Sequence, residues 1–453
     1  MGSFLFNTVS FIVAISVLVA VHEYGHYIVG RWTGMKVLRF SIGFGKPIWS
    51  RVAGPDQTEY CVSAIPLGGY VRFLDSREGP VDAVDEGRAF NQRPIWARIA
   101  VLVAGPAFNF IFAIFAYWAL FVYGVPTVTA AVGEVAAGSY AEAAGLETGD
   151  RIVAVDGETT RDWESTLVAM LGTMVDDGRI PLTLEDNSGR QRNALLNVGD
   201  NANRLTEPGM LFDGLGFQPW RSTDAAAIVG EVSDDSAATR AGLLPGDKIT
   251  AIDGEPIGRF FDLVNVVSTR ADKQVAVEFE RGGRVLTVDT ILGSTERDGK
   301  SHGLLGVTAA VSASDYYYLR KYGLLESVGQ AAERTWSTTM FTLSMLGRML
   351  TGDVSIKNIS GPINIAQFAG ESAENGLDYY LGFLAIVSIS LGVLNLLPVP
   401  VLDGGQIVYQ LVELAKGSPL SERAQVMGQQ VGIFALLILM SFAFYNDIAR
   451  ILG

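Results

Sequence analysis

Long apolar runs alternate with polar segments along the chain, and four of these runs are long enough to be helices that cross a membrane. About 20 apolar residues span the hydrocarbon core of a bilayer. The four runs cover residues 4–28, 99–125, 377–401 and 427–445, of which the last is the shortest. The hydropathy pattern therefore predicts a polytopic α-helical membrane protein with four transmembrane helices.

Two segments next to these runs have other patterns. Residues 36–74 alternate apolar and polar side chains around Gly and Pro turns, which indicates β-hairpins that associate with the membrane. Strands at membrane depth need their backbone groups paired or buried in protein. Residues 324–350 mix apolar positions at helical spacings with charged residues, so we expect an interfacial helix there and not a fifth span.

Basic residues indicate the orientation of the chain. Lys and Arg gather between the first two runs, in residues 31–98, and short loops with this bias remain in the cytoplasm. Counting spans onward then places 127–375 outside, 406–426 inside and both termini outside. No basic residue precedes the first run and no small-residue cleavage site follows it, so we expect an anchor and not a removable signal peptide.

The outer segment contains two copies of one pattern. GEVAAGSYAEAAGLETGDRIVAVDG (133–157) aligns without gaps with GEVSDDSAATRAGLLPGDKITAIDG (230–254). The shared run A-G-L-x-x-G-D-x-I-x-x-[VI]-D-G resembles PDZ domains, in which a short helix, a Gly-Asp turn and an alternating strand follow in that order. We therefore expect two α+β PDZ domains, at 127–220 and 221–312.

The peptide-binding loops are expected at the end of each copy. A PDZ carboxylate-binding segment normally precedes the shared run, but the best matches here, GLGF at 214–217 and LLGV at 304–307, follow it. This order implies circularly permuted PDZ domains that bind or exclude polypeptide by adding a strand to a sheet edge; ordinary Gly-containing strand ends are the alternative. The predicted loop residues are Gly214, Leu215, Gly216, Phe217, Leu305, Gly306 and Val307.

Composition limits the chemistry. A net charge of −14 over 453 residues argues against a nucleic-acid surface, which needs clustered Lys and Arg. Cys61 is the only cysteine, so the chain has no internal disulfide. Imidazole groups that could bind a metal are also few, because the chain has only 3 histidines.

The first apolar run ends in ionisable residues that a membrane helix normally excludes. HEYGH at 22–26 matches H-E-x-x-H, in which two histidines four residues apart bind zinc and the glutamate acts as general base. Metal coordination would satisfy groups that are costly in hydrocarbon. We therefore predict His22 and His26 as metal ligands and Glu23 as the base; histidines bonded to other helices are the alternative.

A catalytic zinc ion takes three protein ligands, so a third must come from elsewhere. His302, the remaining histidine, lies in the outer segment, whereas Asp403 in NLLPVPVLDGGQ (395–406) closes the third run. The first and third runs both end on the cytoplasmic side, which would bring Asp403 to the depth of the histidines. Asp403 is the candidate ligand, and a simple helix-capping turn is the alternative.

Together these motifs resemble the site-2 protease family of intramembrane zinc metalloproteases over nearly the whole chain: H-E-x-x-H, GPAFNF (105–110), N-x-x-P-x-P-x-L-D-G-G and the outer PDZ pair. The resemblance implies one Zn²⁺ held by His22, His26 and Asp403, with Glu23 activating water. It also implies substrate-binding roles for an unwound segment of the third run and for a membrane-reentrant β-loop, through Asn395, Pro398, Pro400, Gly43, Phe44 and Gly45.

The family also implies the biological setting. Its activity would be cleavage of transmembrane segments of pre-trimmed single-pass proteins, such as an anti-sigma factor, and of remnant signal peptides, in the stress response of a bacterial inner membrane. The expected segments fall into four kinds. The transmembrane helices with their flanks are 1–30, 99–126, 377–405 and 427–453, and the cytoplasmic-side segments are 31–98 and 406–426. The PDZ domains are 127–220 and 221–312, and 313–376 holds the interfacial helix and a connector.

Three alternatives remain open from the residues. A non-catalytic PDZ membrane scaffold with a structural metal site is the first. A second zinc peptidase class pairs H-E-x-x-H with a later E-x-x-x-D helix; Glu374 and Asp378 fit that spacing, although the Asn-Gly between them is a turn signal. An ion transporter with histidine and aspartate ligands is the third.

Overall fold

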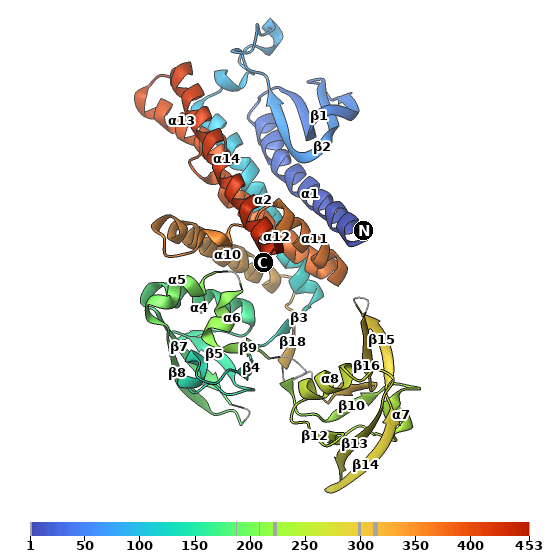
Figure 1. The fold of residues 1–453 in the computed structure, drawn as a ribbon. Helices are drawn as coiled ribbons and strands as arrows, with labels where there is room; N and C mark the ends of the chain where they lie inside the picture. Colours follow the sequence, from blue (N-terminus) through green and yellow to red (C-terminus); the bar gives the residue numbers. More distant parts are fainter. Residues whose placement is uncertain are drawn as a thin grey trace. The chain divides into compact units, whose positions relative to one another are not determined.

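The computed structural model describes residues 2–186, 188–207, 209–220, 224–297, 300–310 and 316–452 (Figure 1). The chain forms two compact units, one made of Met1–Val125 and Arg320–Gly453 and the other of Pro126–Leu319. The sequence predicts one boundary between the two repeats, between residues 220 and 221, and another after residue 312. The first adjoins residues 221–223 and the second lies within residues 311–315. Both boundaries lie outside the described residues.

Long helices dominate the first unit. Figure 1 shows α1, α2 and α12 side by side, and small buried residues of α2, including Ala113 and Ala116, let α12 pack closely against it. Gly25 likewise lets α1 pack closely against α2, because a Cβ there would lie 2.4 Å from the Ala104 carbonyl oxygen. The helices are α1 (Gly2–Trp32), α2 (Ile95–Tyr123), α10 (Glu326–Thr351), α11 (Pro362–Asn375), α12 (Leu377–Leu396), α13 (Asp403–Lys416) and α14 (Glu422–Leu452).

Four of these helices are long and apolar enough to cross a membrane, as the hydropathy pattern predicts: Phe4–Trp32, Ile95–Tyr123, Leu377–Leu396 and Glu422–Arg450. The expectation that the fourth is the shortest is wrong, because the third has 20 residues and the fourth has 29. The third ends early because Leu397 precedes Pro398. A residue before proline is pushed out of the helical region, and Leu397 has φ −62° and ψ 146°.

The segment between the first two spans is a sheet of two long strands, β1 (Val37–Ala53) and β2 (Thr58–Phe73). Residues 39–42 pair with 69–72 on one side and with 59–62 on the other, while 47–53 pair with 58–63. The expected β-structure is therefore present, as one folded sheet. Residues 69–73 form an edge of this sheet, with no further strand paired to them in the described part of the chain.

The connection back to the third span holds more helix than the sequence predicts. α10 buries Ala331, Thr335 and Thr339 and exposes Trp336, as an interfacial helix does, and it is not among the four candidate spans. α11 is a second helix in the segment 313–376, where one was expected. The segment 406–426, expected to be a loop, likewise contains most of α13.

α11 escapes sequence detection because its start is stabilised from far along the chain. The carboxylate of Asp447, on α14, accepts hydrogen bonds from the backbone N–H groups of Gly361, Ile363 and Asn364. An anion at a helix N-terminus satisfies unpaired N–H groups and complements the helix dipole. No local cap in the sequence marks this start.

The second unit repeats one topology, in agreement with the sequence repeat. The first copy has a four-stranded sheet of order β6-β5-β7-β8 and a β4-β9 pair; the second has β12-β11-β13-β14 and a β10-β17 pair, with an added β15-β16 hairpin. Each copy has its own hydrophobic core. The first copy comprises β4 (Val132–Val135), α3 (Tyr140–Ala143), β5 (Arg151–Val155), β6 (Glu158–Thr159), α4 (Trp163–Asp177), β7 (Arg179–Glu185), β8 (Gln191–Asn197), α5 (Ala202–Leu205), α6 (Met210–Leu215) and β9 (Phe217–Pro219).

The second copy follows the same order. Its elements are β10 (Val229–Val232), α7 (Ala237–Arg240), β11 (Lys248–Ile252), β12 (Glu255–Pro256), α8 (Phe260–Ser268), β13 (Gln274–Arg281), β14 (Arg284–Ile291), β15 (Gly293–Arg297), β16 (Lys300–Leu304) and β17 (Val307–Ala309). Two further short strands, β3 (Val125–Val128) and β18 (Tyr317–Arg320), pair with each other.

The Gly-Asp turn of each copy is built around a buried carboxylate. Asp247 accepts hydrogen bonds from Arg281 at 2.7 and 2.6 Å and from the Leu244 N–H at 2.8 Å. Asp150 has the same partners in the first copy, Arg192 and the Glu147 N–H. The aspartate of the repeated motif therefore closes a turn and joins it to another strand of the sheet, β8 in the first copy and β13 in the second.

Acidification is expected to weaken the second copy through this carboxylate. The Arg281 guanidinium holds the pKa of Asp247 below its ordinary value, so Asp247 contributes stability above its unfolded pKa of about 3.9, and that stability is lost as the pH falls through the lower folded value. Amide hydrogen exchange of 229–309 in the full chain, corrected for intrinsic rates, measures this loss. Asp247→Asn should remove this part of the pH dependence, and the exposed Asp289→Asn should retain it. An unchanged dependence in Asp247→Asn would contradict the role.

Candidate metal centre

The two histidines of the first helix meet a carboxylate from the other end of the chain. His22 and His26 lie one turn apart on α1, with 3.1 Å between their Nε2 atoms. Oδ2 of Asp403, the first residue of α13, lies 3.2 Å from Nε2 of His22 and 3.5 Å from Nε2 of His26. The structure thus brings all three predicted ligands into one triangle.

The dimensions of this triangle fit a tetrahedral ion. Ligand atoms about 2.0–2.1 Å from a zinc ion at tetrahedral angles lie about 3.3 Å from one another, close to the three distances observed. In the described part of the chain, only this group brings three His, Cys, Asp or Glu ligand atoms within 4.8 Å of one another. Two imidazoles and one carboxylate leave a fourth position for water.

α2 packs directly on the imidazoles. The Val101 carbonyl oxygen lies 2.7 Å from His26 Nδ1 and accepts its hydrogen bond, which leaves Nε2 free as a ligand atom. Gly105, in the GPAFNF motif, makes this approach possible, since a Cβ there would lie 2.3 Å from His26 Nε2. The motif in the second span is therefore part of the wall of the metal centre.

The break after the third span delivers Asp403. α12 ends at Leu396 and α13 begins at Asp403, so six residues turn the chain back toward the histidines. Gly404 is required in this turn, because a Cβ there would lie 2.2 Å from the Leu396 carbonyl oxygen. The Gln406 side-chain amide donates to the Pro400 carbonyl oxygen at 3.0 Å and closes the turn.

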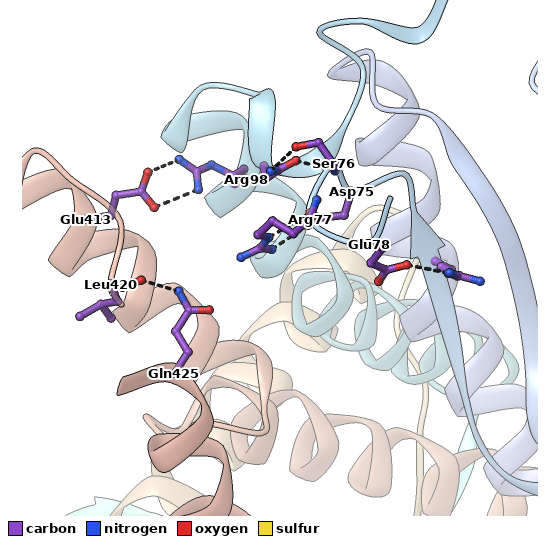
Figure 2. Close-up of polar contacts among 10 residues, drawn as sticks. Asp75, Ser76, Arg77, Glu78, Arg98, Glu413, Leu420 and Gln425 are labelled. Carbon is purple, nitrogen blue, oxygen red and sulfur yellow. Dashed lines mark hydrogen bonds and ion pairs between the residues drawn. The ribbon is translucent and has the colours of Figure 1, made fainter. Parts of the chain in front are cut away.

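An ion pair fixes α13 to α2. Figure 2 shows the Arg98 guanidinium facing the Glu413 carboxylate, with two hydrogen bonds of 3.0 and 2.6 Å. The two side chains are only 9% and 17% exposed, and a bidentate pair of this kind adds geometric specificity as well as energy. The helix that begins with Asp403 is thereby held on the helix that contacts both histidines.

A cavity of about 510 Å³ opens beside the three ligands. Glu23 faces it, and its carboxylate also interacts with the backbone of Val71. The other lining residues come from the sheet edge, the segment that follows it, α2, the end of α12, the turn before Asp403 and the start of α13: Gly69, Tyr70, Val71, Arg72, Phe73, Asp75, Glu78, Phe90, Val101, Leu102, Asn395, Val401, Leu402 and Gln406.

The substrate-binding residues expected in the membrane region lie at different distances from this cavity. Asn395 lines it, whereas Pro398 and Pro400 lie in the irregular turn between α12 and α13 and are not among its lining residues. Gly43, Phe44 and Gly45 do not line it either. The Phe44 ring stacks on that of Tyr70, which does line the cavity, with centroids 6.1 Å apart.

Sequence reasoning predicts an edge strand for the substrate only somewhere within 36–74, and the structure identifies residues 69–73 as the edge that lines the cavity. Its signal in the sequence is Gly69, where a Cβ would lie 2.7 Å from Val19 Cγ1 and 3.3 Å from Glu23 Cγ. The glycine lets the strand edge approach the helix that carries the H-E-x-x-H motif. Only the strand register shows that this segment has a free edge.

The expected PDZ loops occupy equivalent places in the two copies. Gly216 and Gly306 both have positive φ, +82° and +83°, and a Cβ at either would strike a serine, Ser139 or Ser236. Leu215 and Leu305 are buried in their cores, while Phe217 and Val307 begin β9 and β17. Gly214 lies within α6.

Two other sequence candidates stand apart from the metal ligands. His302 lies on β16, in the second unit. Glu374 lies at the end of α11 and Asp378 at the start of α12, so they do not share one helix as the E-x-x-x-D peptidase class requires. That alternative loses its structural basis.

Comparisons with known proteins give a family match and relatives of full length. The model of peptidase family M50 matches residues 10–439. The chain is 41% identical over 453 residues to the regulator of sigma-E protease RseP of Escherichia coli, with all of both chains covered. It is also 41% identical over 456 residues to a Vibrio cholerae chain named as a zinc metalloprotease, again with full coverage of both.

One further relative and one solved structure differ in how much of this chain they cover. The regulator of sigma E protease of Haemophilus influenzae is 41% identical over 457 residues, covering 99% of this chain and 100% of its own. The PDZ domain of an SdrC-like protein from Listeria monocytogenes matches 19% of this chain and 90% of its own, at 24% identity and a TM-score of 0.17.

The family match covers most of the chain, and full-length relatives share two fifths of its residues. Members of the family are zinc-dependent metalloproteases, which agrees with a ligand triangle of two histidines and one aspartate next to a glutamate. The chain belongs to peptidase family M50, the site-2 proteases.

Proposed function

We propose that His22, His26 and Asp403 hold a single zinc ion and that Glu23 is the general base of peptide-bond hydrolysis. The observation that carries this proposal is the ligand triangle of 3.1–3.5 Å in the wall of the cavity that Glu23 faces. Zinc, when bound, polarises a carbonyl and makes a coordinated water acidic. Glu23 accepts the proton of that water and passes it to the leaving amine.

A membrane helix must be opened before its peptide bonds can react, because its carbonyls are already hydrogen-bonded. The edge of residues 69–73 lies beside Glu23 and offers backbone groups to an extended substrate, as strand addition requires. Asn395 lines the same cavity and supplies a side-chain amide for the substrate backbone. Pro398 and Pro400 act indirectly, by ending α12 so that the Asp403 turn can form.

The substrates we propose follow from the names of the relatives. Two relatives are named as regulators of sigma-E, so we propose a single-pass anti-sigma factor as the substrate here. Remnant signal peptides, which also present one short membrane segment, are proposed as a second substrate class. We place the chain in a bacterial inner membrane with 31–98 and 406–426 in the cytoplasm. Both termini and the second unit are then periplasmic, an orientation supported by the Lys and Arg in 31–98.

The two repeats are proposed to be circularly permuted PDZ domains at 127–220 and 221–312. Support comes from the strand that follows each Gly loop, β9 or β17, which pairs with the first strand of its own copy. In a permuted domain, a strand contributed by the end of the copy completes the sheet at its beginning. We propose that the pair excludes substrates whose periplasmic part is still intact.

Removing the metal is expected to abolish cleavage reversibly. Dialysis against a strong chelator should remove one zinc per chain and all cleavage of a transmembrane substrate in detergent, since water then loses its activator. Adding one equivalent of zinc should restore activity, and magnesium, which prefers oxygen ligands, should not. Measurement is by metal content and product formation. Two ions per active chain, or full turnover with no ion, would contradict the single-ion site.

Deleting residues 127–310 is expected to relax substrate choice. The intact enzyme should cleave only a substrate with a trimmed periplasmic part, and the deletion variant should also cleave the untrimmed form, because the barrier is steric. Gel analysis of both substrates with both enzymes measures this, and cleavage of the trimmed substrate by the deletion variant is the control for an assembled site. An untrimmed substrate that still resists this active variant would rule out the filter.

A further inference from the structure

Asn109 is a buried polar residue of α2 beside the metal ligands. It is 0% exposed and lies in the GPAFNF motif. Its side-chain amide reaches His22 Nδ1, at 3.2 Å from Nδ2. The amide oxygen Oδ1 has no hydrogen-bond partner within the described residues. A buried amide oxygen without a hydrogen-bond partner destabilises the fold, so its place beside a ligand histidine calls for an explanation.

The proton on His22 defines that function. A neutral imidazole carries one ring proton, and a metal at Nε2 leaves that proton on Nδ1. Ligand histidines almost always donate this proton to an acceptor that fixes the tautomer and the ring orientation. For His26 the acceptor is the Val101 carbonyl oxygen, at 2.7 Å. For His22 the group next to Nδ1 is the Asn109 side-chain amide. A half turn about the last bond of this side chain decides whether its NH₂ group, a donor, or its oxygen, an acceptor, faces the ring.

We propose that Asn109 is a positioning residue of the metal centre, whose amide presents Oδ1 to the Nδ1–H of His22 and so holds Nε2 in its ligand tautomer. This inference rests on the proposed zinc ligation by His22. After this half turn, Asn109 Oδ1, which otherwise has no hydrogen-bond partner within the described residues, accepts a hydrogen bond from His22. α2 then positions both imidazoles, through a backbone carbonyl at one and a side-chain amide at the other.

Two features make Asn109 suited to this task. Its own backbone carbonyl accepts a hydrogen bond from the Ser388 hydroxyl at 2.9 Å, which ties this turn of α2 to α12. The amide oxygen also has no other hydrogen-bond partner within the described residues, so no neighbouring group competes for it. The position therefore combines a fixed backbone with an available acceptor.

Zinc affinity tests the proposal in the full-length protein, by competition with a chelator. Asn109→Leu removes the acceptor and is expected to weaken zinc binding by about 10–100-fold, the usual cost of losing such a partner. Asn109→Asp retains an acceptor and should stay within roughly threefold of the natural chain. Ser390→Ala, which removes an exposed hydrogen bond within α12 to the Ile386 carbonyl oxygen, is the control and should bind zinc normally.

The histidine rings give a second readout that does not depend on activity. The chain has 3 histidines, so ¹⁵N-histidine labelling yields three ring systems, with His302 as an internal reference outside the first unit. In the zinc-loaded protein, the His22 Nδ1–H should be protected from exchange with water in the natural chain and in Asn109→Asp, and should exchange at least about tenfold faster in Asn109→Leu.

The outcomes separate this inference from the proposed function. Normal zinc affinity and a protected Nδ1–H in Asn109→Leu would overturn the role of Asn109 alone. Equal losses in the Leu and Asp variants would overturn it as well, because a retained acceptor would then have no effect. Failure of zinc to shift the His22 ring signals in the natural chain would instead overturn ligation by His22, and this inference with it.

Discussion

Replacing Glu23 with glutamine is expected to stop peptide-bond cleavage while the chain keeps its zinc. Glutamine has nearly the same shape but no basic carboxylate, and loss of a general base costs about 10²–10⁴ in rate. Glu23 faces the cavity and is not one of the three clustered ligands, so metal binding should persist. The measurement is cleavage of a single-span substrate in detergent, with zinc content determined on the same sample.

The matched control for Glu23→Gln is Glu326→Gln. Glu326 lies in the first turn of α10, remote in the chain from the metal centre, and its amide variant should cleave at the normal rate. If Glu23→Gln cleaves as fast as the natural chain, the glutamate is not the base. The scaffold with a structural metal site makes a different prediction, namely that neither the natural chain nor Glu23→Gln cleaves the substrate while both retain zinc.

Replacing Asp403 with alanine is expected to remove the ion itself. The carboxylate is one of three ligands, so zinc affinity should fall by more than the about 10–100-fold that outer-shell changes cost, and cleavage should fall with it. Calorimetric or chelator titration measures the affinity. Excess zinc should restore only part of the activity, because the two remaining imidazoles do not complete the site.

Asp378→Asn provides the control for Asp403→Ala. Asp378 also lies in the first turn of a helix, α12, so a role limited to helix capping predicts similar effects at both positions. The E-x-x-x-D alternative predicts zinc loss at Asp378 instead. Ligation by Asp403 requires zinc loss at Asp403 only, and normal zinc binding by Asp403→Ala would refute it.

Local patterns predicted the metal centre better than they predicted its surroundings. H-E-x-x-H fixes the geometry of His22 and His26 within one helix turn, and Asp403 stands out as an acid that closes an apolar run. The substrate side depends on which strands pair. The free edge at 69–73 follows from a register in which 39–42 have partners on both sides, and no short motif encodes that register.

The missed helices have a related cause. α11 is stabilised at its start by Asp447, more than 80 residues later, and α13 is fixed on α2 by the ion pair between Arg98 and Glu413. Both depend on tertiary contacts that override a segment's own weak preference. Pro398 and Pro400 show in the sequence as helix breakers, but the direction in which the chain turns after them does not, and neither proline lines the cavity.

The three residues of the ligand triangle are added to the chain at very different stages of translation. His22 and His26 enter the membrane early in synthesis, whereas Asp403 is added only after most of the chain has been translated. A nascent or prematurely ended polypeptide therefore carries two imidazoles without their carboxylate partner. With Asp403 as the proposed third ligand, peptidase activity requires the last tenth or so of the chain to be synthesised, so a truncated chain in the bilayer would be inactive.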